Sequence, residues 1–130
     1  MGICLRNKDY QMDMGYGAFF RLRRTIANLY NKEFGSLYNT LLNCNDYSTF
    51  ESKVQTVINQ YNLDEDIIDF LFQSDCEGKI NYKTCRKILN ICKDYETREM
   101  FGYVYSNHSF AYFKAMLKDC VINRRNLYWS

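Results

Sequence analysis

The chain has 130 residues, enough for one domain with one hydrophobic core. Hydrophobic residues make up 47% and charged residues 25%, a balance that excludes a disordered chain. The 17 basic and 15 acidic residues leave a net charge of only +2, whereas a dedicated nucleic-acid binder usually shows a stronger basic excess. No apolar run is long enough to span a membrane. Proline is absent, which suits a mainly helical fold.

The cysteine pattern favours reduced thiols in the cytoplasm. The N-terminal residues lack the apolar run of a signal peptide, so we expect a cytoplasmic protein. No two cysteines are spaced as Cys-x-x-Cys, and the chain has one histidine, His108, so the sequence predicts no zinc site and no cofactor. The six cysteines are Cys4, Cys44, Cys76, Cys85, Cys92 and Cys120.

The opening residues predict a β-hairpin followed by a helix. Residues 3–6 and 10–14 each alternate apolar and polar side chains around a turn-like Asn-Lys-Asp. From Ala18 to Tyr30 the apolar residues recur at helical spacing. Arg23 borders this apolar stripe, so we expect its charge to be paired with a carboxylate.

Further helices are predicted along the middle of the chain. One covers residues 33–43, and another opens at a capping box formed by Ser48 and Glu51. A short segment after Asp64 is apolar on most sides and should lie in the centre of the core. An acidic turn then leads to a helix capped by Asn81.

The remaining segments complete the predicted fold class. A strand at residues 101–105 is one reading of an ambiguous stretch, and a last helix covers residues 109–123. Residues 1–130 show no linker and no internal repeat. The sequence therefore predicts a mainly α (α+β), single-domain helical bundle of about five to six helices with a small N-terminal β-hairpin.

The acidic turn between two predicted helices invites a comparison with calcium loops. When Gly78 is aligned with the loop glycine, Asp75 and Glu77 fall on two ligand positions. The first and last ligand positions are then Gln73 and Thr84, which supply no carboxylate. The pattern favours a structural turn, in which Gly78 adopts a left-handed backbone, over a cation site.

A thiol enzyme or small hydrolase is one alternative function. A cysteine nucleophile needs a basic neighbour or an electropositive pocket, and Cys76 lies between Asp75 and Glu77. His108 is the only histidine that could serve as its base. The sequence assigns no catalytic residue.

Nucleic-acid binding is a second alternative. Arg21 and Arg24 lie on the first predicted helix, whereas Arg124 and Arg125 precede Tyr128 and Trp129 near the other end of the sequence. Arginine beside aromatic rings can follow a phosphate backbone and stack on bases. The simpler interpretation is a solvated helix face and a basic helix C-terminus.

Two segments of the chain resemble a group of uncharacterised bacterial proteins. Their Ser-Asp-Cys-[Asp/Glu]-Gly turn, followed by a cysteine-bearing helix, is similar to residues 74–85 here. Residues 15–23 resemble the aromatic segment that opens their first helix. The resemblance covers about a third of the chain, implies a bacterial or phage origin, and brings no established activity.

The leading hypothesis is a non-enzymatic, cytoplasmic protein-binding module. Surface tyrosines and Trp129 are residue types that anchor protein interfaces, and no catalytic constellation is visible. A phage- or defence-related inhibitor would be one version of such a module. The candidate contact residues are Arg21, Arg24, Arg124, Arg125, Tyr128 and Trp129.

Overall fold

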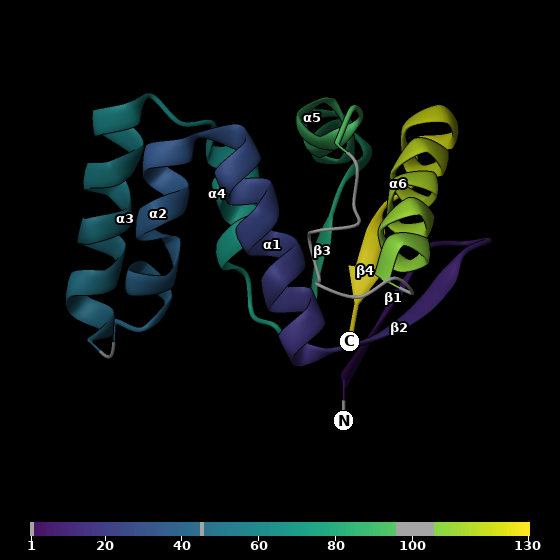
Figure 1. Cartoon of the computed structure of the whole chain (residues 1–130), viewed down its shortest axis with the longest axis horizontal. Coiled ribbons are helices and arrows are strands. Elements are labelled where there is room, and N and C mark those ends of the chain that lie inside the picture. The colour runs from purple at the N-terminus through teal and green to yellow at the C-terminus, as the bar shows by residue number, and fades with distance from the viewer. Residues whose placement is uncertain (1, 45, 96–105) are drawn as a thin grey trace.

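The computed structural model describes residues 2–44, 46–95 and 106–130, with the backbone alone for residues 47 and 106–109. The sheet, α5 and α6 lie at one end, α2 and α3 at the other, with α1 between them (Figure 1). The predicted fold class is confirmed, with six helices in the described residues and an N-terminal hairpin. The elements in chain order are β1 (Gly2–Arg6), β2 (Gln11–Gly15), α1 (Tyr16–Tyr30), α2 (Lys32–Leu42), α3 (Tyr47–Tyr61), α4 (Glu65–Phe72), β3 (Gly78–Ile80), α5 (Tyr82–Cys92), α6 (Ser106–Asn123) and β4 (Leu127–Trp129).

The predicted hairpin is part of a larger antiparallel sheet. β1 and β2 pair from Gly2 opposite Gly15 to Arg6 opposite Gln11. On its other side β1 pairs with β4, and β3 completes the strand order β2-β1-β4-β3. The two three-residue strands, β3 and β4, were not predicted. The possible strand at 101–105 lies outside the described residues.

Helix α1 connects the sheet to the helical end of the molecule. It begins at Tyr16, two residues earlier than predicted, and buries Phe19, Leu22 and Ile26. It packs against α2, α4, α5 and β2. The apolar stripe of α1 therefore lies between the sheet and the other helices that it contacts.

Two helix starts agree with the sequence and one does not. Asp64 and Asn81 accept hydrogen bonds from the first turns of α4 and α5 through their side chains, and Asn81 is the cap that the sequence predicted. The capping box at Ser48 is wrong, because Asp46 caps α3. The Asp46 carboxylate accepts both the backbone N–H of Ser48, at 2.9 Å, and its hydroxyl, at 2.6 Å. The Ser48 side chain is thus already engaged in the cap of Asp46.

The buried side chains form one hydrophobic cluster that joins helices and sheet. The centre of α4 is buried as predicted, with Ile67, Ile68, Phe70 and Leu71 inside. Helix α6 begins at Ser106 rather than residue 109 and packs against α5 and β4. Among the described residues, no helix is long and apolar enough to cross a membrane.

Candidate interaction site on the solvent face of the sheet

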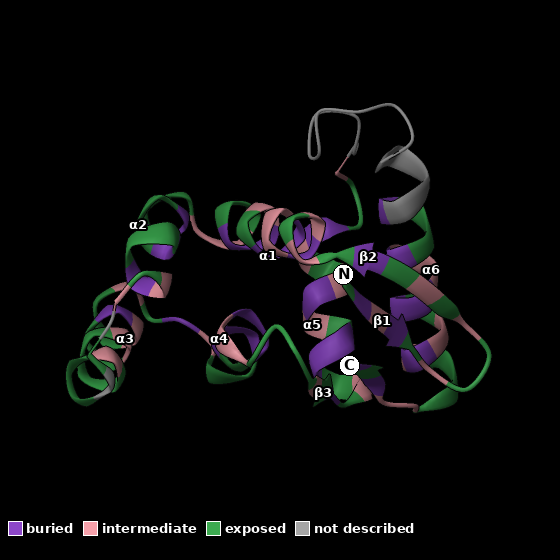
Figure 2. Ribbon diagram, turned by 90° about the horizontal axis from the view of Figure 1, so that it is seen from below, coloured by how far each residue is buried: buried purple, intermediate pink, exposed green. Residues whose placement is uncertain are grey.

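Each strand of the sheet has one buried side and one exposed side. Leu5 of β1 and Leu127 and Trp129 of β4 are buried, whereas Arg6 and Tyr128 beside them are exposed and Cys4 is half-buried. Figure 2 shows the same alternation along β1 and β2. Successive strand residues point to opposite faces, so the exposed residues share one face. We call it the solvent face: Cys4, Arg6, Gln11, Asp13, Lys79, Tyr128 and Ser130.

The strand register places a polar row across the solvent face. Arg6 lies opposite Gln11 on one side and opposite Tyr128 on the other, and Tyr128 lies opposite Lys79. The row therefore runs Gln11, Arg6, Tyr128, Lys79 across all four strands. Tyr128 is 40% exposed and has a cation on each neighbouring strand. An exposed aromatic ring between two cations is a typical arrangement for binding a partner.

Two hollows lie beside Tyr128, and Arg6 lines both. The turn hollow, of about 450 Å³, also includes Lys79, Glu77 and Ser130, with Trp129 beneath. The Lys8 hollow, of about 410 Å³, has Asn7, Lys8, Arg125 and Asn126 as its other lining residues. Tyr128 thus lies between two shallow hollows, each with charged residues in its lining.

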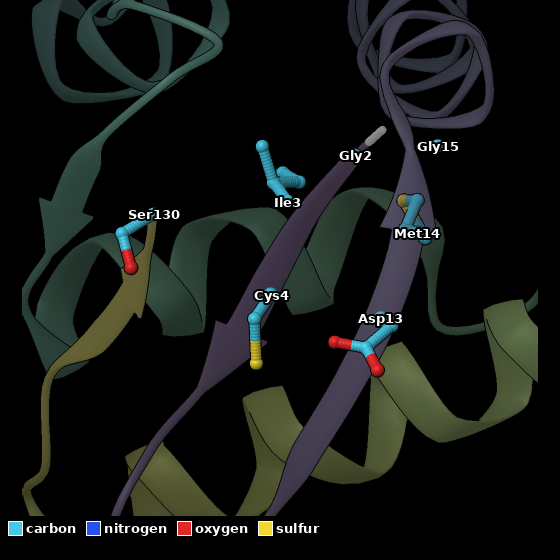
Figure 3. A pocket seen from close by; sticks show the side chains of 7 residues that line it. All are labelled: Gly2, Ile3, Cys4, Asp13, Met14, Gly15 and Ser130. Carbon is cyan, nitrogen blue, oxygen red and sulfur yellow. The ribbon is translucent and has the colours of Figure 1, made fainter.

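A third hollow lies farther along the same face. It measures about 490 Å³ and is lined by residues 2–4 of β1, residues 13–15 around the end of β2, and Ser130. Figure 3 shows the Cys4 thiol, the Asp13 carboxylate and the Ser130 side chain around it. Ser130 lines both this hollow and the turn hollow, whereas Arg6 and Tyr128 line both the turn hollow and the Lys8 hollow, so neighbouring hollows share lining residues.

The cations of this site fall into two groups. Arg125 is neutralised, since its guanidinium binds Asp9 and, at 3.1 Å, Asp119. The hydrogen bond to Asp9 raises the pKa of Arg125, and the same bond lowers the pKa of Asp9. Arg6, Lys8 and Lys79 form no ion pair with any residue that the structure describes, and all three are exposed. Two positive charges of the solvent face, Arg6 and Lys79, therefore have no carboxylate of the described chain as an ion-pair partner.

The turn that borders the site is held from below by two buried side chains. Arg23 donates to the carbonyl of Phe70, at 2.8 Å, and to that of Gln73, at 2.6 Å. Trp129 Nε1 donates to the carbonyl of Ser74 at 2.9 Å. The expected carboxylate partner of Arg23 is wrong: the guanidinium caps the C-terminal end of α4, where carbonyl groups concentrate negative potential.

Trp129 and Gly78 fit together at the floor of the turn hollow. The expectation that Trp129 is a surface anchor is wrong, because its ring is 1% exposed. Gly78 does not adopt a left-handed backbone; it begins β3, opposite Trp129. A Cβ atom at Gly78 would collide with the Trp129 ring. The glycine is therefore needed for close packing rather than for an unusual backbone conformation.

The acidic turn projects into solvent as a structural connection between α4 and β3. Ser74, Asp75, Cys76 and Glu77 are all exposed, and the Ser74 hydroxyl accepts the Cys76 N–H at 3.1 Å. In the part of the chain that the structure covers, no group of three or more His, Cys, Asp or Glu side chains could hold a metal ion. Gln73 and Glu77 of this connection line the turn hollow, as does Gly78 at the start of β3.

The four arginines predicted to bind nucleic acid do not come together. Arg21 and Arg24 lie on α1, whereas Arg124 and Arg125 follow α6, with α5 packed between the two helices (Figure 1). The Arg24 guanidinium lies over the Phe20 ring, 5.4 Å from its centroid. Of this set, Arg125 alone lines one of the three hollows.

The thiols lie in three kinds of environment. Cys85 and Cys92 are fully buried; burial raises the pKa of Cys92 to about 11, and a hydrogen bond to the Cys120 thiol raises that of Cys85. Cys76 is exposed and adjoins the Asp75 carboxylate at 3.5 Å. A hydrogen bond with the backbone of Asp46 lowers the pKa of Cys44, and a second hydrogen bond, with the Thr49 hydroxyl, lowers it further. The side chain of His108, the one histidine that could serve as a base, lies outside the described residues.

The comparisons with known proteins add no relative. No protein-family model, no curated protein and no solved structure matches the chain. The resemblance to bacterial proteins with a Ser-Asp-Cys-[Asp/Glu]-Gly turn therefore stays a prediction. Any functional assignment rests on the geometry of the site.

Sequence reasoning identified part of this site and missed the rest. Arg125 and Tyr128 were predicted as contact residues, and both line the Lys8 hollow. Arg6, Lys8 and Lys79 were not singled out. The alternation in residues 3–6 does place Arg6 on the exposed side of a strand, but the chain gives no local sign that Lys79 pairs beside it.

Proposed function

We propose that this chain is a non-enzymatic, cytoplasmic module that binds another protein through the solvent face of its sheet. One observation carries the proposal: Tyr128 stands 40% exposed at the centre of that face, between two hollows of about 450 and 410 Å³. Tyrosine offers a large rigid contact area and a polar tip, which is why it is enriched at interface hot spots.

The backbone under the ring supports a rigid binding surface. β4 is paired on both sides, with β1 and with β3, and its two other residues are buried in the core. The backbone that carries Tyr128 is therefore fixed before a partner arrives. Binding through a pre-ordered surface loses less conformational freedom than binding through a loop.

A matched pair of tyrosine variants tests the proposal. Tagged wild-type protein, Tyr128→Ser and Tyr112→Ser would be used for quantitative capture from lysate of the native host. Tyr112, on α6, is 38% exposed and lines none of the three hollows. Its hydroxyl accepts the backbone N–H of Gln11 at 3.4 Å, at the edge strand farthest from Lys79, so this variant removes a ring of similar exposure away from Tyr128. We expect the wild type and Tyr112→Ser to retain the same partner, and Tyr128→Ser to retain at least about tenfold less of that partner.

Equal retention by all three proteins would contradict the proposal, as would a wild type that retains nothing. Circular dichroism and an unfolding curve of each variant show whether the fold is intact. Since Tyr128 is an exposed strand residue, its replacement should change the free energy of unfolding by only about 0.5 kcal/mol.

A further inference from the structure

We propose that the segment bound at the solvent face is an acidic, extended stretch of the partner protein, with carboxylates that reach Arg6 and Lys79 on the two sides of Tyr128. This inference rests on the proposed function and adds the chemical class of the ligand. It follows from three properties of the face: its unmatched charges, the spacing of those charges, and the shape of the hollows.

The unmatched charges are positive around Tyr128. Arg6 and Lys79 form no ion pair with any described residue, whereas the charge of Lys8 is attracted by the neighbouring Asp9. Among the described residues that line the two hollows beside the ring, Glu77 is the one acidic residue. Arg6 donates one hydrogen bond through Nη1, to the Ser130 hydroxyl at 2.7 Å. A guanidinium carries five N–H donors, so a fork remains for a carboxylate.

The strand spacing sets the distance between the two principal cations. Arg6 and Lys79 lie on strands separated by β4, and both are in register with Tyr128. Neighbouring strands are ~4.8 Å apart, so the two backbone positions are separated by about 10 Å. An extended peptide advances about 3.3 Å per residue, so two acidic residues two to three positions apart can reach both cations.

The shape of the site favours a short protein segment over single-stranded nucleic acid. A nucleic-acid strand needs a continuous cationic groove and a series of aromatic rings. On the solvent face, among the described residues, Tyr128 is the one exposed ring, so the series of rings on which successive bases would stack is missing. Two separate hollows around one ring instead suit two side chains of a peptide.

Short fluorescein-labelled peptides provide a direct test. One alternates glutamate and serine, a neutral version alternates glutamine and serine, and a single-stranded oligothymidylate of similar length represents nucleic acid. Binding to the intact 130-residue chain would be followed by fluorescence anisotropy at two salt concentrations. Trp129, the single tryptophan of the chain, lines the turn hollow and gives a second, unlabelled readout.

Three single charge-removing variants and one double variant locate the binding. We expect Arg6→Gln and Lys79→Gln each to weaken binding of the glutamate peptide about fivefold. This is the effect of losing one exposed ion pair worth about 1 kcal/mol. The double variant should lose about 25-fold if the two sites act independently. Lys83→Gln on α5 removes the same charge from an exposed position that lines none of the three hollows, and it should bind like the wild type.

Each result supports or overturns the acidic-segment proposal. Binding of the glutamate peptide that weakens with salt and with loss of Arg6 or Lys79, but not Lys83, supports it. Absence of peptide binding, tighter binding of oligothymidylate, or equal losses in all three variants overturns it. If the glutamate peptide does not bind while Tyr128→Ser still loses the captured partner, the proposed function stands and the proposed ligand chemistry is wrong. If the wild type and Tyr128→Ser capture the partner equally, the proposed function itself is overturned.

Discussion

Tyr38 is a buried phenol whose position ties two helices together. Its hydroxyl, on α2, donates to the carbonyl of Leu71 on α4 at 2.5 Å, and its ring packs among Phe20, Phe34 and Phe72. Burial raises the pKa of Tyr38 from 10.0 to about 12. Because an ionised phenolate could not donate this hydrogen bond, the folded state retains the proton.

Stability should therefore fall in alkali, and part of the fall should depend on Tyr38. The raised pKa means that its contribution is complete below pH 10 and is lost as pH rises towards about 12. Across that interval we expect the wild type to lose about 2 kcal/mol more of its free energy of unfolding than Tyr38→Phe does. At neutral pH, Tyr38→Phe should cost about 1 kcal/mol through the lost hydrogen bond.

Urea unfolding curves at a series of pH values measure both effects. Tyr128→Phe, which removes a phenol from the surface, serves as the control. Parallel alkaline slopes for the wild type and Tyr38→Phe would contradict the assignment of that slope to Tyr38.

At the scale of single elements, local patterns predicted the helices well and the short strands poorly. The caps Asp64 and Asn81 act on neighbours within three residues, so their effect is visible in the sequence. β4 has three residues, and its partner β1 lies more than a hundred positions away in the chain. No periodicity within three residues can reveal such a pairing, and hence the burial of Trp129 was also missed.

The cap of α5 gives a prediction at this scale. Asn81 accepts the Thr84 N–H at 3.0 Å, so Asn81→Ala leaves a helix-terminal donor without its partner. We expect a loss of about 1 kcal/mol in the free energy of unfolding. Asn90→Ala, at an exposed position within the same helix, removes the same side chain without touching the cap and should be neutral or slightly stabilising.

Thermal and chemical unfolding of Asn81→Ala and Asn90→Ala measure the loss of unfolding free energy in each variant. A larger loss for Asn90→Ala than for Asn81→Ala would show that the amide side chain stabilises α5 in some way other than capping.

At the scale of the whole molecule, the candidate site depends on long-range pairing that composition conceals. The net charge of +2 gave no reason to expect an unpaired cationic surface. The surface exists because β1, β3 and β4 place Arg6 and Lys79 on one face, while the turn at residues 73–77 is held by Arg23 and Trp129. Neither contact has a signature in the sequence near those two residues.

The fold is supported unevenly from one end to the other. Around the sheet, fully buried side chains of β1, β4, α1 and α6 share the core. Helix α3, at the opposite end (Figure 1), has one buried side chain among its described residues, Val57, and packs mainly against α2. A contact between the Phe50 and Phe72 rings, 5.6 Å apart, adds a connection to α4.

This difference should appear in native-state hydrogen exchange. The free energy that opens a segment follows the apolar area it buries, so the amides of α3 should exchange through a local opening that leaves the sheet intact. We expect their opening free energy to lie several kcal/mol below that of α1 and β1, with Val57→Ala accelerating exchange in α3 alone. Exchange of α3 and β1 amides at one common free energy, lowered equally in both by Val57→Ala, would instead mean that the chain unfolds as a single cooperative unit. Since the proposed binding surface belongs to the sheet, opening of α3 should leave peptide binding unchanged.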